Sequence, residues 1–245
     1  MREIRSDAER EQWIDACGVR SILPARAAAQ LKLCAFQKGE ALCREGDRAR
    51  FLYFLLQGRC RVVRLLQTGR QCLLRFFQPF AVLGDFEFAE GGAVRTDVEA
   101  ADDLLCLCLP MAQREQLLAD PVFLRFLCAA LCHKAILRDR DLADAISFSV
   151  TRRAASYILA GAREGEFHDN HTHMAEFLGC SHRQLLRVLG QLCGQGALCR
   201  LDGGGYRVAN AALLSSLSAG VYAAEPFTYP GLGLHRPDTT AETKG

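Results

Sequence analysis

The stretch Thr172–Leu189, which reads THMAEFLGCSHRQLLRVL, carries the most specific structural signal in this chain of 245 residues. Gly179 stands where the end of one helix needs a residue in the left-handed conformation. Ser181 can cap the next helix, with Gln184 three residues later as its partner in a capping box. The stretch therefore predicts two short helices joined by a tight turn, as in a helix-turn-helix.

The second of these helices has an apolar side and a polar side. Its apolar residues follow the i, i+3, i+4, i+7 spacing of a buried helix face: Leu185, Val188, Leu189 and Leu192. A recognition helix presents its base-reading side chains on the outward side near the N-terminus, which here holds His182, Arg183, Leu186 and Arg187. The two arginines can each bind guanine or a phosphate, and the leucine can contact a thymine methyl group. The alternative is an ordinary helical hairpin with solvated arginines.

The segments around these helices complete a small domain. Two short strands, 197–201 and 206–208, flank a glycine-rich turn and predict a β-hairpin. As the wing of a winged helix-turn-helix, the hairpin would place Arg200 and Arg207 against the backbone phosphates of double-stranded DNA.

The first half of the chain has a different texture. From Cys34 to Pro110 it consists of short β-rich runs broken by glycines. Runs that recur about every 8–12 residues with turn signals between them predict an antiparallel barrel or jelly roll. The clearest runs are 51–55, 61–65, 72–77 and 104–109.

A long helix is expected between the barrel and the helix-turn-helix. Asp120 can act as its N-cap, with Pro121 in the first turn. Its apolar stripe is longer than one small barrel can cover, and comprises Phe123, Phe126, Leu127, Ala130, Leu131 and Leu137. Pairing with the same helix of a second subunit would bury the remainder, so we expect a homodimer.

We therefore predict an α+β protein with an N-terminal jelly-roll barrel (a double-stranded β-helix), a long dimerisation helix and a C-terminal winged helix-turn-helix. The predicted boundaries are a helical segment at 1–33, the barrel at 34–118, the dimerisation helix at 119–147, the DNA-binding domain at 148–219 and a flexible tail at 220–245.

Composition limits the other possibilities. The net charge of +2 does not indicate a large basic face. The sequence has neither an apolar run long enough to span a membrane nor an N-terminal signal core, so we expect a cytoplasmic protein. Its 12 cysteines should then be free thiols, most of them packed as small apolar residues. The histidines that precede the turn, His168, His171 and His173, are expected to be solvated or capping residues rather than metal ligands.

With these motifs in place, the chain resembles the CRP/FNR family of bacterial regulators, and within it the YeiL-type members. The resemblance covers residues 34–218, and its barrel motifs are FQKGE at 36–40, EGD at 45–47 and FLYFLLQG at 51–58. It implies a cyclic-nucleotide-binding-like barrel, a homodimer on palindromic promoter sites and contact with RNA polymerase. In the recognition helix it implies that the positions of His182, Arg183 and Arg187 face bases.

The resemblance also locates a candidate effector site. Nucleotide binders of the family carry Gly-Glu and then Arg-Ser in the phosphate-binding cassette, where this chain has Gly84-Asp85 and Arg95-Thr96. Asp85 is one methylene shorter than glutamate, and Glu87 adds a negative charge that disfavours a bound phosphate. Arg138-Asp139 stands where cyclic-AMP-responsive members place a Thr-Ser pair over the adenine, and could instead form an intersubunit ion pair. A cyclic nucleotide, another ligand and no ligand all remain open.

An iron–sulfur cluster is the second cofactor hypothesis, because the FNR branch of the family carries one. The N-terminal cysteine cluster of that branch is absent here, where only Cys17 precedes the barrel. Cys128 and Cys132 lie one helical turn apart and could bind metal with His133 or with a second subunit, although burial is the commoner fate of such cysteines.

Two other classes of function compete with a regulator. A jelly-roll metalloenzyme needs histidines inside the barrel, and none occurs between Cys34 and Pro110, so we expect no catalysis. A sensor or adaptor protein could use the second domain to bind protein rather than DNA. Alanine replacement of Arg183 and Arg187 distinguishes the two classes, because it weakens DNA binding only if these side chains contact DNA.

Overall fold

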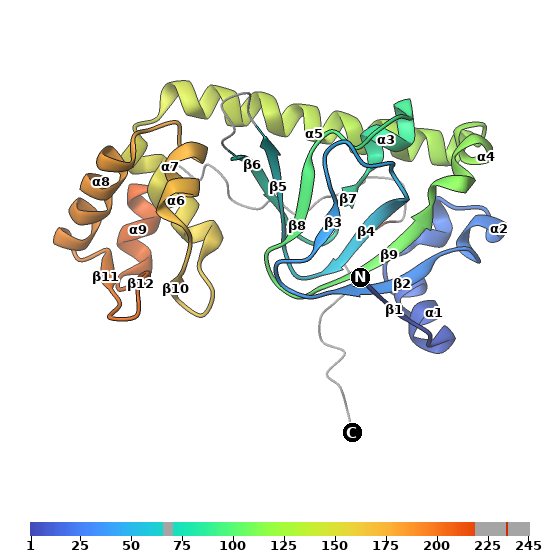
Figure 1. The fold of residues 1–245 in the computed structure, drawn as a ribbon, viewed down its shortest axis with the longest axis horizontal. Helices are drawn as coiled ribbons and strands as arrows, with labels where there is room; N and C mark the ends of the chain where they lie inside the picture. The colour runs from blue at the N-terminus through green and yellow to red at the C-terminus, as the bar shows by residue number, and fades with distance from the viewer. Residues whose placement is uncertain (66–70, 219–233, 235–245) are drawn as a thin grey trace. The chain divides into compact units, whose positions relative to one another are not determined.

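The computed structural model describes residues 1–65, 71–218 and 234 (Figure 1). These residues form two compact units. The first contains residues 1–64 and 76–135, and the second contains 136–218 together with 65 and 71–75. The predicted tail, 220–245, lies outside the described residues apart from Leu234.

The first unit begins with a short strand and three helical segments. They are β1 (Arg2–Ile4), α1 (Asp7–Ala16), the 3-10 helix η1 (Val19–Ser21) and α2 (Ala25–Ala28). The helical prediction for 1–33 missed β1, which pairs antiparallel with β2 (Lys32–Phe36). A strand of three residues is too short to show the alternation of apolar and polar residues that identifies a strand in sequence.

Two antiparallel sheets form the jelly-roll barrel, as predicted. Their strand orders are β1-β2-β9-β4-β7 and β3-β8-β5-β6. The strands not yet named are β3 (Ala41–Cys43), β4 (Phe51–Gln57), β5 (Cys60–Leu65), β6 (Gln71–Phe77), β7 (Val82–Leu83), β8 (Asp97–Ala100) and β9 (Leu104–Pro110). The central strands β4 and β9 are buried almost throughout, which explains why they are apolar runs rather than alternating ones.

Helical segments cover the barrel. They are α3 (Asp85–Glu90), the 3-10 helix η2 (Met111–Gln113), α4 (Arg114–Leu118) and the first half of α5 (Pro121–Ser147). The predicted N-cap is confirmed, because Asp120 Oδ1 accepts hydrogen bonds from the backbone N–H groups of Val122 and Phe123, both at 2.9 Å. Phe123 and Phe126 of α5 are fully buried, and the Phe126 ring stacks on Phe54 of β4 with centroids 6.0 Å apart. Among the described residues, no helix is long and apolar enough to cross a membrane.

The second unit contains the predicted helix-turn-helix and hairpin. Its elements are α6 (Val150–Gly161), β10 (Glu166–Phe167), α7 (His171–Phe177), α8 (His182–Gly194), β11 (Leu198–Arg200), β12 (Tyr206–Val208) and α9 (Ala211–Leu217). β10 was not predicted; it extends the hairpin to a three-stranded sheet in the order β10-β12-β11. α9 was not predicted either, and it packs against α6.

Candidate nucleic-acid interface and effector site

The turn between α7 and α8 has the geometry that its sequence predicts. Gly179 adopts a φ of 60°, in the left-handed region. Its N–H donates to the Glu176 carbonyl at 3.1 Å, and the Cys180 N–H donates to the Ala175 carbonyl at 2.9 Å. This pair of bonds is the Schellman motif, which ends α7 and turns the chain. Ser181 then caps α8, since its Oγ accepts from the Gln184 N–H at 3.1 Å.

A buried arginine that was not predicted from sequence supports this turn. Arg153 of α6 is only 8% exposed. Its Nη1 donates to the Leu178 carbonyl at the end of α7 at 2.7 Å, and its Nε donates to the Phe148 carbonyl at 3.3 Å. Arg153 thus ties α6 to the end of α7. In sequence Arg153 cannot be told apart from its neighbour Arg152, which is exposed. The only local signal of burial is the pair of alanines that follows it, Ala154 and Ala155.

The two sides of α8 are as predicted. The apolar side is buried, with Leu185, Val188, Leu189 and Leu192 at most 3% exposed. The other side is exposed and carries His182, Arg183, Leu186 and Arg187. Within the part of the chain that the structure describes, neither Arg183 nor Arg187 forms an ion pair. Leu186 lies between them and is 39% exposed. One surface therefore holds an apolar side chain and two guanidinium groups that form no ion pair in the described residues.

A histidine pair lies at the N-termini of α7 and α8. The ring centroids of His171 and His182 are 6.2 Å apart, and His171 lies 5.8 Å from the ring of Tyr206 in β12. Partial burial lowers the pKa of His171, and the positive potential of His182 and Arg200 lowers it further, against a smaller opposing effect of Asp169. His171 is therefore biased towards its neutral form.

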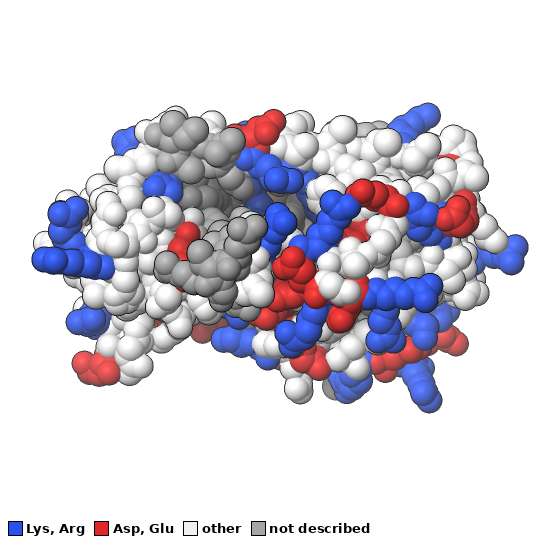
Figure 2. Space-filling model, turned by 45° about the horizontal axis from the view of Figure 1, so that its top comes forward, with Lys and Arg blue, Asp and Glu red and all other residues white. Residues whose placement is uncertain are grey.

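The hairpin carries the two arginines that were predicted to bind phosphate, and they differ in their surroundings. Arg200 of β11 is exposed, whereas Arg207 Nη2 pairs with Glu166 Oε1 of β10 at 2.9 Å. The Arg207 side chain is 61% exposed and that of Glu166 is 38% exposed, so the pair is weak and a phosphate can compete for Arg207. In Figure 2 basic side chains project from the second unit with few acidic neighbours, whereas both signs are intermixed over the barrel.

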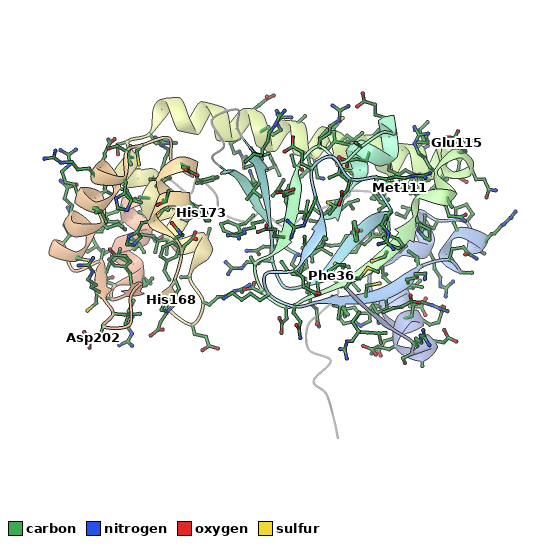
Figure 3. The ribbon with its side chains drawn as sticks, viewed as in Figure 1. Phe36, Met111, Glu115, His168, His173 and Asp202 are labelled. Carbon is green, nitrogen blue, oxygen red and sulfur yellow. The ribbon has the colours of Figure 1, made fainter. Side chains whose placement is uncertain are left out.

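The described residues form no metal site. They contain no group of three or more His, Cys, Asp or Glu side chains arranged to hold an ion. Figure 3 shows His168 beside β10 and His173 on α7, with Asp202 at the tip of the hairpin. Cys60, Cys106 and Cys108 are buried as expected, but Cys128 and Cys132 are exposed. Cys128 and Cys132 lie on the side of α5 that the barrel of the same chain does not cover, so the expectation that they are packed inside does not hold within one chain.

The candidate effector site in the barrel is occupied by groups of the chain itself. Gly84, with a φ of 82°, precedes α3, and a Cβ there would lie 2.8 Å from the Phe51 carbonyl oxygen. Asp85 is fully buried and its Oδ1 lies 2.5 Å from the Nζ of Lys134 on α5. Lys134 is 49 positions from Asp85 in the chain, and no sequence pattern predicted this contact.

The arginine of the cassette also has an internal partner. Arg95 Nη2 lies 2.5 Å from Glu90 Oε2, and both side chains are more than half exposed. The backbone N–H of Arg95 donates to Oε1 of the buried Glu87 at 3.1 Å. Thr96 is partly buried beside it, and Arg138 is an exposed residue of α5.

Comparison with known proteins agrees with this geometry. Residues 33–120 match the family model of the cyclic nucleotide-binding domain. The regulatory protein YeiL of Escherichia coli O157:H7 is 34% identical over 192 residues, which cover 78% of this chain and 87% of YeiL. The cyclic AMP receptor protein of Thermus thermophilus is 29% identical over 195 residues, covering 76% of this chain and 88% of that protein.

A solved structure shares the fold. A CRP-family transcriptional regulator from Thermus thermophilus superimposes with a TM-score of 0.65 at 23% identity, over 78% of this chain and 100% of that one. A cyclic-nucleotide-binding barrel followed by a long helix and a helix-turn-helix defines a class of transcription regulators. With the similarity to YeiL, the chain belongs to the CRP/FNR family of transcription regulators.

Proposed function

We propose that this protein is a cytoplasmic, sequence-specific DNA-binding regulator that acts as a homodimer on palindromic promoter sites. The observation that carries the proposal is the outward face of α8, where Arg183, Leu186 and Arg187 are exposed and neither arginine has an ion-pair partner among the described residues. A buried apolar side and the Ser181 cap hold this face on the rest of the unit.

Each exposed residue of α8 has a role in the proposed complex. Arg183 and Arg187 bind guanine O6 and N7 in the major groove, and Leu186 contacts a thymine methyl group. His182 and Ser181, at the N-terminus of α8, lie beside the DNA backbone or the first base of the half-site. Arg200 and Arg207 of the hairpin bind phosphates and fix the position of α8 without reading sequence.

The apolar stripe that was expected to be left for a second subunit is buried within one chain, with Phe123, Phe126, Leu127, Ala130 and Leu137 at most 4% exposed. The proposed dimer therefore uses the outer side of α5. Leu124, Cys128, Leu131 and Ala135 follow 4-3-4 spacing, the pattern of a coiled-coil seam. Leu124 is 41% exposed and Cys128 is also exposed, so the described chain leaves this apolar side uncovered. Arg138 and Asp139 follow along the helix, where they can form ion pairs between subunits. A palindromic site requires the two recognition helices of such a dimer to lie about one DNA turn, ~34 Å, apart.

The barrel cassette, with Gly84, Asp85, Arg95 and Thr96, is the proposed regulatory site. Thermus thermophilus has a relative named cyclic AMP receptor protein. In this chain Asp85 and Arg95 are engaged by Lys134 and Glu90, so cyclic AMP is not assigned as the effector. The described residues contain no group of three or more His, Cys, Asp or Glu side chains that could hold a metal ion. The proposed regulation therefore does not involve an iron–sulfur cluster. We propose no catalytic role for this protein. From the family resemblance, we propose that the DNA-bound dimer regulates transcription by contact with RNA polymerase.

Selection of bound sequences from a random DNA pool, followed by titration of the selected duplex, tests the proposal. We expect Arg183→Ala or Arg187→Ala to weaken binding by about 1–3 kcal/mol and to relax base preference at one position of each half-site. Arg26→Ala removes the same charge from an exposed position of the barrel unit and should change affinity less than twofold. If the double variant Arg183→Ala/Arg187→Ala binds the duplex as wild type does, α8 does not read DNA and this proposal fails. If wild type selects no duplex at all, the adaptor hypothesis replaces it.

A further inference from the structure

An ammonium group is enclosed inside the barrel unit. The Nζ of Lys134 lies 2.5 Å from Asp85 Oδ1, 5.2 Å from the ring centroid of Phe77 and 5.5 Å from that of Phe86. One carboxylate and two aromatic faces are the groups that recognise an organic cation in proteins. Here the cation comes from α5, while its partners come from β6 and α3. We call these four residues the ammonium cage.

The cage is closed to solvent at its charged centre. Lys134 is 7% exposed and Asp85 is fully buried. Burial raises the pKa of the Cys60 thiol to about 12, against a lowering effect of Lys134. That thiol therefore stays neutral, and the group that faces the ammonium nitrogen is the carboxyl group of Asp85. Separating α3 from α5 would leave either charge without a partner in a buried site, which is strongly unfavourable.

The cage differs from the other internal contact of the cassette. Arg95 and Glu90 are both exposed, and an exposed pair of this kind is readily opened. Oδ2 of Asp85, by contrast, is buried and has no hydrogen-bond partner in the described structure, so the carboxylate depends on Lys134 alone. Of the two charged contacts, only the Asp85–Lys134 pair joins the cassette to the long helix.

We propose that Lys134 acts as a built-in substitute for an effector: its ammonium group holds α3 against α5 without any bound ligand. The family resemblance implies that cyclic-AMP-responsive members hold a nucleotide with the cassette and with a residue pair of the long helix. In this chain a side chain of the long helix reaches the cassette directly, so the barrel is set in its α3-docked state from the moment it folds. The inference concerns regulation of the proposed DNA-binding function and rests on that function only for its DNA readout.

Hydrogen exchange followed by mass spectrometry on the full-length protein tests the tether. Lys134→Met keeps most of the side-chain length without its charge, and Asp85→Asn keeps the shape of the carboxylate. We expect peptides that cover α3 to exchange at least tenfold faster in either variant, and the double variant to show less than the sum of the two effects. Peptides from β4 and β9 should change less than twofold, because the tether is local.

Two controls separate the tether from general damage. Lys32 and Glu3 form an ion pair that is about 40% exposed on both sides, so Lys32→Met should leave the exchange of α3 unchanged. If Lys134→Met does not fold, as its thermal melt would show, Asp85→Glu provides a milder displacement of the same contact. A tether should also leave the exchange of α3 in wild type within twofold when 1 mM cyclic AMP is added.

The DNA arm uses the duplex selected with wild-type protein, and we expect Lys134→Met to bind it at least fivefold more weakly at a temperature where the variant is folded. Three results would overturn the proposal: wild-type exchange of α3 in both single variants, protection of α3 by cyclic AMP in wild type, or unchanged DNA affinity in folded Lys134→Met. If wild type binds no duplex, the proposed DNA-binding function fails, and the exchange measurements still decide whether the tether exists.

Discussion

Replacement of the buried arginine behind the helix-turn-helix is the sharpest stability test of this structure. Arg153→Met keeps an unbranched side chain of similar length but removes both hydrogen bonds of the guanidinium, at 2.7 Å to Leu178 and 3.3 Å to Phe148. Leu178 is fully buried, so its carbonyl loses its partner away from water. A hydrogen bond from a charged donor contributes about 1.5–3 kcal/mol, and the longer bond adds less, so we expect a loss of about 2–4 kcal/mol.

Thermal unfolding of the full chain, followed by far-ultraviolet circular dichroism, measures this loss. For a domain of about 60–100 residues, 1 kcal/mol corresponds to about 4–8 °C in Tm, so the transition of the second unit should fall by roughly 10–25 °C. Exchange of peptides from α7 and α8 identifies which transition belongs to that unit. The matched control is Arg152→Met at the neighbouring position, whose exposed guanidinium lies 5.8 Å from the centroid of the Phe148 ring and which should change stability by less than about 1 kcal/mol. Equal melting curves for the two variants would refute the role given to Arg153.

Two further predictions concern pH and assembly. Burial is the main cause that lowers the pKa of His171 in the folded chain. As pH falls, the unfolded chain therefore binds a proton at His171 at a higher pH than the folded chain does. The free energy of unfolding of the second unit should then decrease as pH falls below about 7. Urea unfolding between about pH 7.5 and pH 5 should show a smaller pH dependence in His171→Gln, and an unchanged slope would contradict the assignment. Leu124→Glu places two like charges in the proposed seam of α5 and should convert a dimer to a monomer in sedimentation velocity. Val122→Glu, about 200° around the helix from Leu124, should remain dimeric, and a dimeric Leu124→Glu would exclude this seam.

Features specified by neighbouring residues were predictable from sequence. A helix cap or a Schellman turn depends on residues two to five positions apart, so Asp120, Gly179 and Ser181 could be assigned before any fold was known. The two sides of α8 follow from its apolar period in the same way. Among the candidate site residues, those on α8 were therefore found where they were expected.

Short strands without a repeating pattern could not be predicted. β1 has three residues and β10 has two, too few to show alternation. Their existence depends on hydrogen bonds to β2 and β12, which lie far along the chain. The ion pair between Glu166 of β10 and Arg207 was missed for the same reason.

The sequence by itself determined the class of this protein: its helix-turn-helix, its glycine-rich barrel motifs and the order in which they occur are all encoded locally. Tertiary structure alone decided what Lys134 and Arg153 do. Lys134 meets Asp85 across 49 positions, and Arg153 meets Leu178 across 25. Lysine and arginine are surface residues in most proteins, and no local pattern marks the few that are buried. Their roles arise because the fold encloses a charge and must then supply its partner from another element.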